Sequence, residues 1–169
     1  MSVEIRNEMA NDVDAIDAVT TAAFLATPHT DHTEQFIVKA LRKAGKLTVS
    51  LVAAVDGEVV GHVAVSPVSI SDGASGWHGL GPISVLPAYQ GQGVGSRLMR
   101  EALSALRESG AFGCVVLGEP GFYGRFGFRA EPGLVLPNVP PEYFQAVSFG
   151  GAAMPCGNVS YDESFNARA

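Results

Sequence analysis

The sequence has only two cysteines, Cys114 and Cys156, too few and too far apart for a metal motif or a disulfide framework. Basic residues are also scarce, with 11 Lys and Arg against 17 Asp and Glu. This balance excludes a non-specific nucleic-acid binder, because such proteins neutralise phosphates with a basic face. The longest apolar run, residues 47–55, is far shorter than the roughly 20 residues of a membrane span. No apolar stretch of signal-peptide type opens the chain, so the cytoplasm is the expected compartment.

What the chain has is a high apolar content, 47% of its 169 residues. A chain of this length and composition predicts one well-packed domain spanning residues 1–169. Cys114 lies within an apolar run and is interpreted as a core residue rather than a reactive one. The acidic balance still allows one anionic small molecule, held by local backbone dipoles.

Hydrophobic periodicity and turn residues predict the order β-α-α-β-β-β-α-β-α-β-β, which describes a mixed α/β domain around a twisted sheet. Asp56-Gly57, between two β-rich runs, is the strongest hairpin signal. The expected strands cover residues 3–6, 47–55, 58–70, 80–85, 112–117, 144–149 and 159–165. A first helix is expected after Asn11 and Asp12, a second helix ends near Gly45, and a third covers residues 93–109. One or two helical turns are expected over residues 119–126, and the segment after Phe128 is broken by prolines.

A glycine-rich turn connects the strand at residues 80–85 to the following helix. Glycines alternate at Gly91, Gly93 and Gly95, so successive N–H groups can line one concavity at a helix N-terminus. This arrangement suits a pyrophosphate, although it is equally compatible with a plain strand-to-helix turn. A dinucleotide fingerprint would need glycine where Ser96 stands, and a Walker loop is excluded because Gly45-Lys46 is followed by leucine.

Two segments carry a family resemblance. Gln90-x-x-Gly93-x-Gly95, after an apolar strand and Pro87, resembles the acyl-CoA pyrophosphate motif of the GNAT superfamily of N-acetyltransferases. Downstream, Gly121-Phe-Tyr-Gly-Arg-Phe-Gly-Phe128 resembles that superfamily's Phe-Tyr-x-x-x-Gly-Phe segment and, with the residues before it, a bacterial branch of acetyltransferases. The resemblance implies a central twisted mixed β-sheet of about seven strands flanked by about four helices.

The resemblance also implies acetyl-CoA as co-substrate. The strand before the turn would pair with the pantetheine arm through its backbone, and the turn would hold the pyrophosphate. Arg97 and Arg100 could assist the phosphates or form a solvated helix face. The positions matched to the family's binding motif are Ile83, Ser84, Val85, Gln90, Gly91, Gln92, Gly93, Val94, Gly95, Ser96 and Arg97.

Tyr123 matches the tyrosine that many GNAT enzymes place beside the thioester sulfur as general acid, and the alternative is a core tyrosine. Many family members also carry a glutamate on the strand ahead of the turn. Residues 79–85 contain no carboxylate here, so another group must accept the proton of the amine. The candidates are His62, His78 and Glu119, each of which is also compatible with a structural role, and a water relay is equally credible.

The leading hypothesis is an acetyl-CoA-dependent N-acetyltransferase that moves the acetyl group by direct attack to a primary amine of a small molecule, peptide or protein. The alternative is a non-catalytic acyl-CoA-binding module, which the missing strand carboxylate suggests. A nicotinamide oxidoreductase fails on the glycine spacing. No metal is expected, because His29 and His32 match no zinc spacing. By the resemblance, residues 27–33 border the acceptor cleft, and they are interpreted either as a substrate-gating loop or as a plain polar turn. The superfamily often dimerises, so a homodimer is expected.

Overall fold

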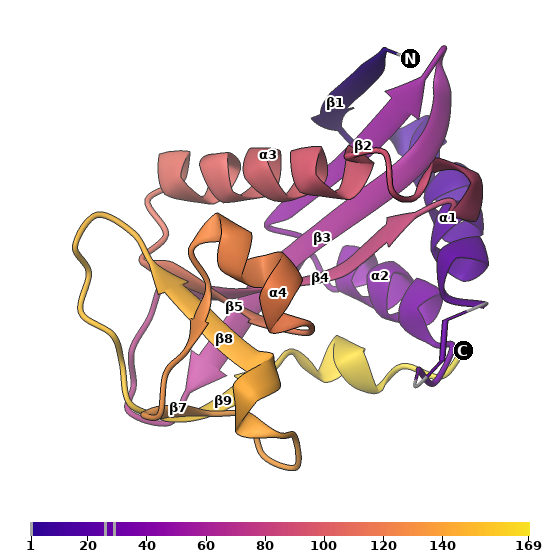
Figure 1. Ribbon diagram of the computed structural model, residues 1–169. Coiled ribbons are helices and arrows are strands. Elements are labelled where there is room, and N and C mark those ends of the chain that lie inside the picture. Colours follow the sequence, from indigo (N-terminus) through magenta and orange to yellow (C-terminus); the bar gives the residue numbers. More distant parts are fainter. Residues whose placement is uncertain (1, 26, 29) are drawn as a thin grey trace.

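The computed structural model describes residues 2–25, 27–28 and 30–169 (Figure 1). The loop expected at residues 27–33 includes His29, which lies outside the described residues. Among the described residues, no helix is both long and apolar enough to cross a bilayer. The strands are β1 (Val3–Asn7), β2 (Val49–Val55), β3 (Glu58–Ile70), β4 (Trp77–Val85), β5 (Gly113–Leu117), β6 (Arg129–Ala130), β7 (Leu134–Val135), β8 (Phe144–Ser148) and β9 (Gly157–Tyr161).

Four α-helices are present in the described part of the chain, together with short 3₁₀ turns. The α-helices are α1 (Val13–Leu25), α2 (Glu34–Lys43), α3 (Val94–Glu108) and α4 (Pro120–Tyr123). The 3₁₀ turns are η1 (Ala10–Asp12), η2 (Pro87–Tyr89), η3 (Gly124–Phe126), η4 (Pro141–Tyr143) and η5 (Glu163–Asn166). The hairpin prediction is confirmed, since Asp56 and Gly57 have φ values of 51° and 80°, as a primed two-residue turn requires.

The sheet runs in the order β1-β2-β3-β4-β5-β8-β6, with β9 paired to the second half of β3 and to the short β7. All the pairs on the main path are antiparallel except β4 with β5. The sheet is therefore mixed, and the described residues form nine strands rather than the predicted seven. The two additional strands, β6 and β7, have two residues each and lie in the segment after Phe128 for which no strand was predicted. This architecture agrees with the predicted mixed α/β fold class.

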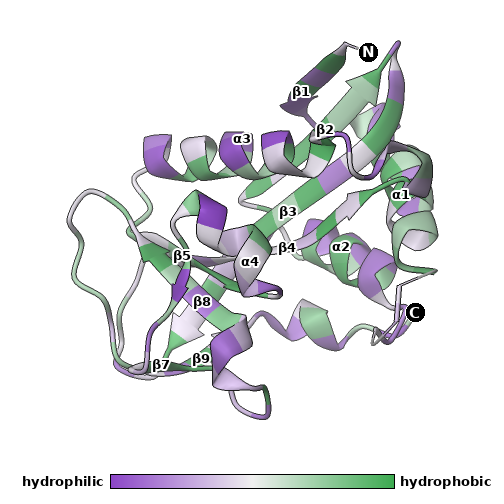
Figure 2. Ribbon diagram, in the orientation of Figure 1, coloured by the Kyte–Doolittle hydropathy of each residue, from purple (hydrophilic) through white to green (hydrophobic). Residues whose placement is uncertain are grey.

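The helices cover opposite faces of the sheet. Leu51 and Ala53 on β2 belong to a core cluster shared with α3, whereas Val52 between them packs with side chains of α1 and α2. This follows from the alternation of side chains along a strand. Figure 2 shows the result: hydrophobic residues dominate the central strands, and α3 alternates between hydrophilic and hydrophobic positions.

Two predicted elements differ from the structure. The strand expected at residues 159–165 ends at Tyr161, because the Asp162 carboxylate accepts the N–H of Ser164 at 2.9 Å and begins the turn η5. The strand expected at residues 80–85 begins earlier, at Trp77, where parallel pairing to Gly113 extends it. The pairing of β4 with β5 is confined to these first residues of β4.

Candidate active site

Strands β4 and β5 pair over only a short stretch and then diverge. Their parallel ladder joins Trp77 with Gly113 and ends at Gly79 with Val115, although β4 continues to Val85. On the other side of β4 the register against β3 shifts between Val63 and Val65, so β4 carries one extra residue around Gly81 and Pro82. A bulge of this kind bends a strand, and here it lies where β4 leaves β5.

The divergence leaves backbone groups of β4 facing an open edge. The Leu86 N–H bonds the carbonyl of Val60 at 2.8 Å, so the alternation of an antiparallel ladder turns the N–H and C=O of Ile83 and Val85 away from β3. Gln90 already uses one of these groups, because its Nε2 donates to the Val85 carbonyl at 3.0 Å. The Ser84 side chain is buried on the opposite face, 3.5 Å from the Thr20 hydroxyl.

The glycine-rich turn follows directly and opens onto the start of α3. Gly91 and Gly93 have φ values of 74° and 86°, and an added Cβ at either position would meet nothing within 4 Å. Gly93 is the N-cap of α3, so no side chain satisfies the first N–H groups of the helix, and its first turn contains no acidic residue. The positive end of the helix dipole is therefore uncompensated and open, which is the arrangement that binds anions.

A cavity of about 560 Å³ joins this turn to the open edge of β4. Seven of its lining residues were predicted from the motif, and these are Ile83, Val85, Gln90, Gly91, Gly93, Gly95 and Ser96. The side chain of Val94 is buried in the core, and that of Gln92 donates to the Ala88 carbonyl. Arg97 donates to the carbonyl of Val3 on β1, and it does not line the cavity.

Arg125 is the basic residue of this cavity, and sequence reasoning missed it. Its guanidinium lies 4.9 Å from the ring centroid of Phe122 and 5.7 Å from that of Phe126, both favourable cation–π distances. Stacking therefore holds a positive charge beside the turn. Arg100, which was considered for the phosphates, instead lies over Phe126 at 5.5 Å. The arginine within the Phe-Tyr-Gly-Arg segment was the available signal.

Tyr123 ends α4 and packs by its ring edges. Its centroid lies 5.0 Å from that of Phe122 and 6.1 Å from that of Phe128, both in T-shaped geometry. The ring also lies against Gly118, where a Cβ would come within 2.5 Å of it. Burial raises the pKa of the Tyr123 hydroxyl above its ordinary value of 10, so the group stays protonated at neutral pH. A protonated hydroxyl can act as a proton donor.

A second cavity, of about 420 Å³, adjoins the first. Ile83 lines both cavities, Tyr123 lines the second, and its neighbour Phe122 lines the first. The structure therefore places the glycine turn and the open strand edge around the first cavity and Tyr123 on the second, with Ile83 in the lining of both.

None of the three candidates for the general base lines either cavity. Glu119 is exposed at the N-cap of α4, where its carbonyl accepts the Phe122 and Tyr123 N–H groups. His78 lies near the start of β4, where the ladder to β5 is intact, and it lines a separate cavity beside Trp77. Their assignment as the base therefore finds no support in the geometry.

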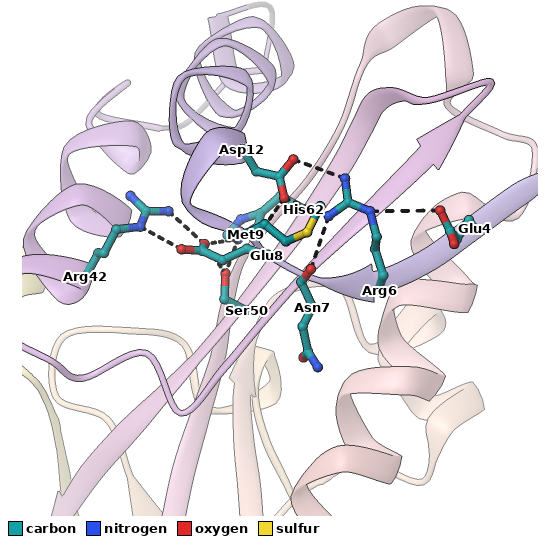
Figure 3. Close-up of polar contacts among 9 residues, drawn as sticks. All are labelled: Glu4, Arg6, Asn7, Glu8, Met9, Asp12, Arg42, Ser50 and His62. Atoms are coloured by element: carbon teal, nitrogen blue, oxygen red, sulfur yellow. Dashed lines mark hydrogen bonds and ion pairs between the residues drawn. The ribbon is translucent and has the colours of Figure 1, made fainter.

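His62 is fully buried on the face of the sheet that α1 covers (Figure 3). It pairs with Ser84, so its ring lies on the opposite side from Ile83 and Val85. Its Nε2 is 2.8 Å from the Ser50 hydroxyl, which donates to the Glu8 carboxylate, and Arg42 bonds the same carboxylate twice at 2.8 Å. Burial, with Arg42 as a smaller cause, lowers the pKa of His62 to about 4. The ring is neutral at pH 7 and too weak a base for this role.

The buried His62 predicts acid-sensitive stability. Its pKa is about 4 when folded and 6.5 in its ordinary state, so the unfolded chain binds more protons between these values. The free energy of unfolding should fall by about 3 kcal/mol as pH drops from 6.5 to 4. His62→Gln should flatten this slope in urea unfolding at pH 7 and 4.5, whereas His32→Gln, at an exposed site, should not. If the free energy of unfolding changes equally with pH in all three proteins, His62 is not the cause of the acid sensitivity.

Cys114 is fully buried in β5, as predicted, and burial raises the pKa of its thiol well above the ordinary range. A thiol of this kind is not a nucleophile at neutral pH. Within residues 2–25, 27–28 and 30–169, no group of three or more His, Cys, Asp and Glu side chains is placed to hold a metal ion.

Comparison with known proteins agrees with these observations. The family model described as an acetyltransferase (GNAT) domain matches residues 46–130, which include the glycine turn and Tyr123. The uncharacterized N-acetyltransferase YhbS of Escherichia coli K12 is 40% identical over 126 residues, covering 74% of this chain and 72% of that protein. The uncharacterized N-acetyltransferase YjhQ of the same strain is 30% identical over 141 residues, covering 80% of this chain and 76% of YjhQ.

Two crystal structures are similar over nearly the whole chain. A GNAT family acetyltransferase from Brucella melitensis in complex with acetyl-CoA has a TM-score of 0.86 and 48% identity, covering 97% of this chain and 98% of that one. YhbS from Escherichia coli in complex with CoA has a TM-score of 0.85 and 35% identity, covering 99% of this chain and 93% of that one. The resemblance that the two motifs predicted is confirmed. The chain belongs to the GNAT family of acetyltransferases.

Proposed function

We propose that this protein transfers the acetyl group of acetyl-CoA to a primary amine by direct attack. The observation that carries the proposal is the continuity of the site: an open edge of β4 leads into the uncapped start of α3 at one end and to Tyr123 at the other. A free strand edge joins an anion site to a proton donor. This arrangement suits an extended ligand that has a pyrophosphate for the anion site and a thioester for the proton donor. The similar structures in complex with acetyl-CoA and CoA support the same ligand.

The binding residues act mainly through their backbone. Ile83 and Val85 offer N–H and C=O groups to the two amides of a pantetheine arm, as another β-strand would. The N–H groups from Gly91 to Ser96 would hold the pyrophosphate, since an added Cβ at Gly91 or Gly93 would stand in open space. Arg125 adds the one positive side chain on this wall among the described residues. A cavity of about 560 Å³ is of the size that binds small molecules.

Tyr123 supplies the proton that the leaving group needs. Acetyl-CoA brings the thioester, whose C–S bond breaks as the amine nitrogen forms the new C–N bond. The Tyr123 hydroxyl gives its proton to the departing sulfur, and the proton that the nitrogen releases restores the hydroxyl. The incoming ammonium first loses a proton to water, because none of the candidates His62, His78 and Glu119 lines either cavity. The products are one amide, one free CoA thiol and the proton released to water.

Thiol release tests this proposal. Purified protein with acetyl-CoA should release CoA thiol only when an amine is added, and the amines to pool are small amines, aminoglycosides, amino acids and peptides. A reaction without acceptor is the control. If acetyl-CoA raises the melting temperature and no pool releases thiol, the non-catalytic acyl-CoA-binding module is favoured instead. If acetyl-CoA gives neither release nor a thermal shift, the interpretation of the glycine turn is wrong.

A further inference from the structure

The cavity beside Tyr123 has a composition that limits what can enter it. Side chains from α1, α2, β4, β5 and the C-terminal turn η5 meet there, and most of them are apolar. Phe165 of η5 packs on Tyr161 in a tilted arrangement with ring centroids 4.8 Å apart, and η5 packs against α2, so this C-terminal segment forms one wall. Figure 1 shows this C-terminal segment running beneath α2. A ligand in this space is therefore surrounded largely by aromatic and aliphatic groups.

One charged group interrupts this apolar wall. Glu34 is the single charged side chain among the described residues that line the cavity. Its Oε1 is shielded from water and has no hydrogen-bond partner in the described part of the structure. A buried, unpaired carboxylate oxygen costs free energy, because it has lost its water without gaining a donor. As the first residue of α2, Glu34 is favoured by the helix dipole, but this does not supply the missing donor.

The position of Glu34 is suited to meeting a substrate. Ile37 lies three residues further along α2, so the two side chains share one helix face, and both line the cavity. Ile83 and Tyr123 belong to the same lining, and Ile83 also borders the cavity of the glycine turn. A molecule held by Glu34 is thus in the space from which the acetyl group, bound along β4, would be attacked.

We infer that the acceptor is a primary monoamine on an apolar body, aromatic or aliphatic, whose ammonium group is held by the Glu34 carboxylate. This inference rests on the proposed function and names its acceptor class. The ammonium supplies the donor that Oε1 lacks, and the apolar walls take the rest of the molecule. A polyamine or an aminoglycoside would bring further cations into a space whose described lining holds no second carboxylate, and their desolvation would be uncompensated.

Matched amines test the inference. Pentylamine and cadaverine have the same chain length and differ by one ammonium group, and 2-phenylethylamine adds an aromatic body. Wild-type kcat/KM should be at least about tenfold higher for pentylamine and 2-phenylethylamine than for cadaverine or kanamycin. Glu34→Gln should raise KM for 2-phenylethylamine about tenfold to 100-fold, because a charge-assisted hydrogen bond is lost. Glu101→Gln, at an exposed glutamate of α3, should leave KM unchanged.

The readouts separate this inference from the proposed function. Glu34→Gln should keep the wild-type melting temperature and Kd for acetyl-CoA, so a change in amine KM reports the acceptor site alone. If no amine releases thiol, calorimetric binding of 2-phenylethylamine to wild type and Glu34→Gln still decides whether Glu34 holds the ammonium. Equal use of kanamycin or cadaverine, or identical amine affinity in Glu34→Gln, would overturn the inference while leaving acetyl transfer itself intact.

Discussion

Tyr123→Phe is expected to lower kcat by about 100-fold to 10,000-fold, the usual contribution of a positioned proton donor, with little change in Kd for acetyl-CoA. The substitution removes one oxygen and keeps the ring, so the edge-to-ring packing on Phe122 and Phe128 is preserved. The acetyl group would still bind along β4, but the departing thiolate would leave without a proton. Steady-state kinetics together with calorimetric binding of acetyl-CoA separates the two effects.

A matched control is available in the same chain. Tyr143 is exposed in η4, outside both cavities, so Tyr143→Phe should leave kcat unchanged. Since burial raises the pKa of Tyr123 above 10, the donor stays protonated up to that pH, and kcat of the wild type should not fall on the alkaline side below it. Equal turnover of Tyr123→Phe and wild type would remove the hydroxyl from the mechanism.

Local signals in the sequence predicted most of the framework. Asp56-Gly57 sets a two-residue turn through its own backbone preferences, and the glycines at 91, 93 and 95 with the following apolar spacing set the start of α3. Each of these features depends on neighbours a few residues away. The two family motifs fall on such features, and for this reason the glycine turn and Tyr123 could be located before the structure.

The remaining site residues depend on register and on distant packing. His62 was a plausible base on its strand, but its pairing with Ser84 puts it on the face that α1 covers. Arg125 lines the first cavity with its guanidinium over aromatic rings, and Glu34 and Tyr123 line one cavity only because α2 and α4 border the same space. Periodicity alone gives neither the face of the sheet on which a side chain lies when a bulge shifts the register, nor the contacts between elements far apart in the chain.

Gly95→Leu tests the anion site without disturbing the fold. Gly95 is the second residue of α3 and is helical, and an added Cβ would have only Val85 near it, at 3.9 Å. Leucine is also a better helix former than glycine, so the melting temperature should not fall. Gly93 is less suitable because its φ of 86° would strain any other residue by about 1–2 kcal/mol.

The leucine side chain at position 95 would occupy the cavity where the backbone N–H groups meet the pyrophosphate. Losing two hydrogen bonds to a charged group costs about 3–6 kcal/mol, so Kd for acetyl-CoA should rise more than about 100-fold. Ser104→Leu adds the same side chain to an exposed position further along α3 and should bind acetyl-CoA like the wild type. If a stable Gly95→Leu protein binds acetyl-CoA with wild-type affinity in calorimetry, the glycines serve only the turn, because an anion site filled by a leucine side chain cannot hold a diphosphate.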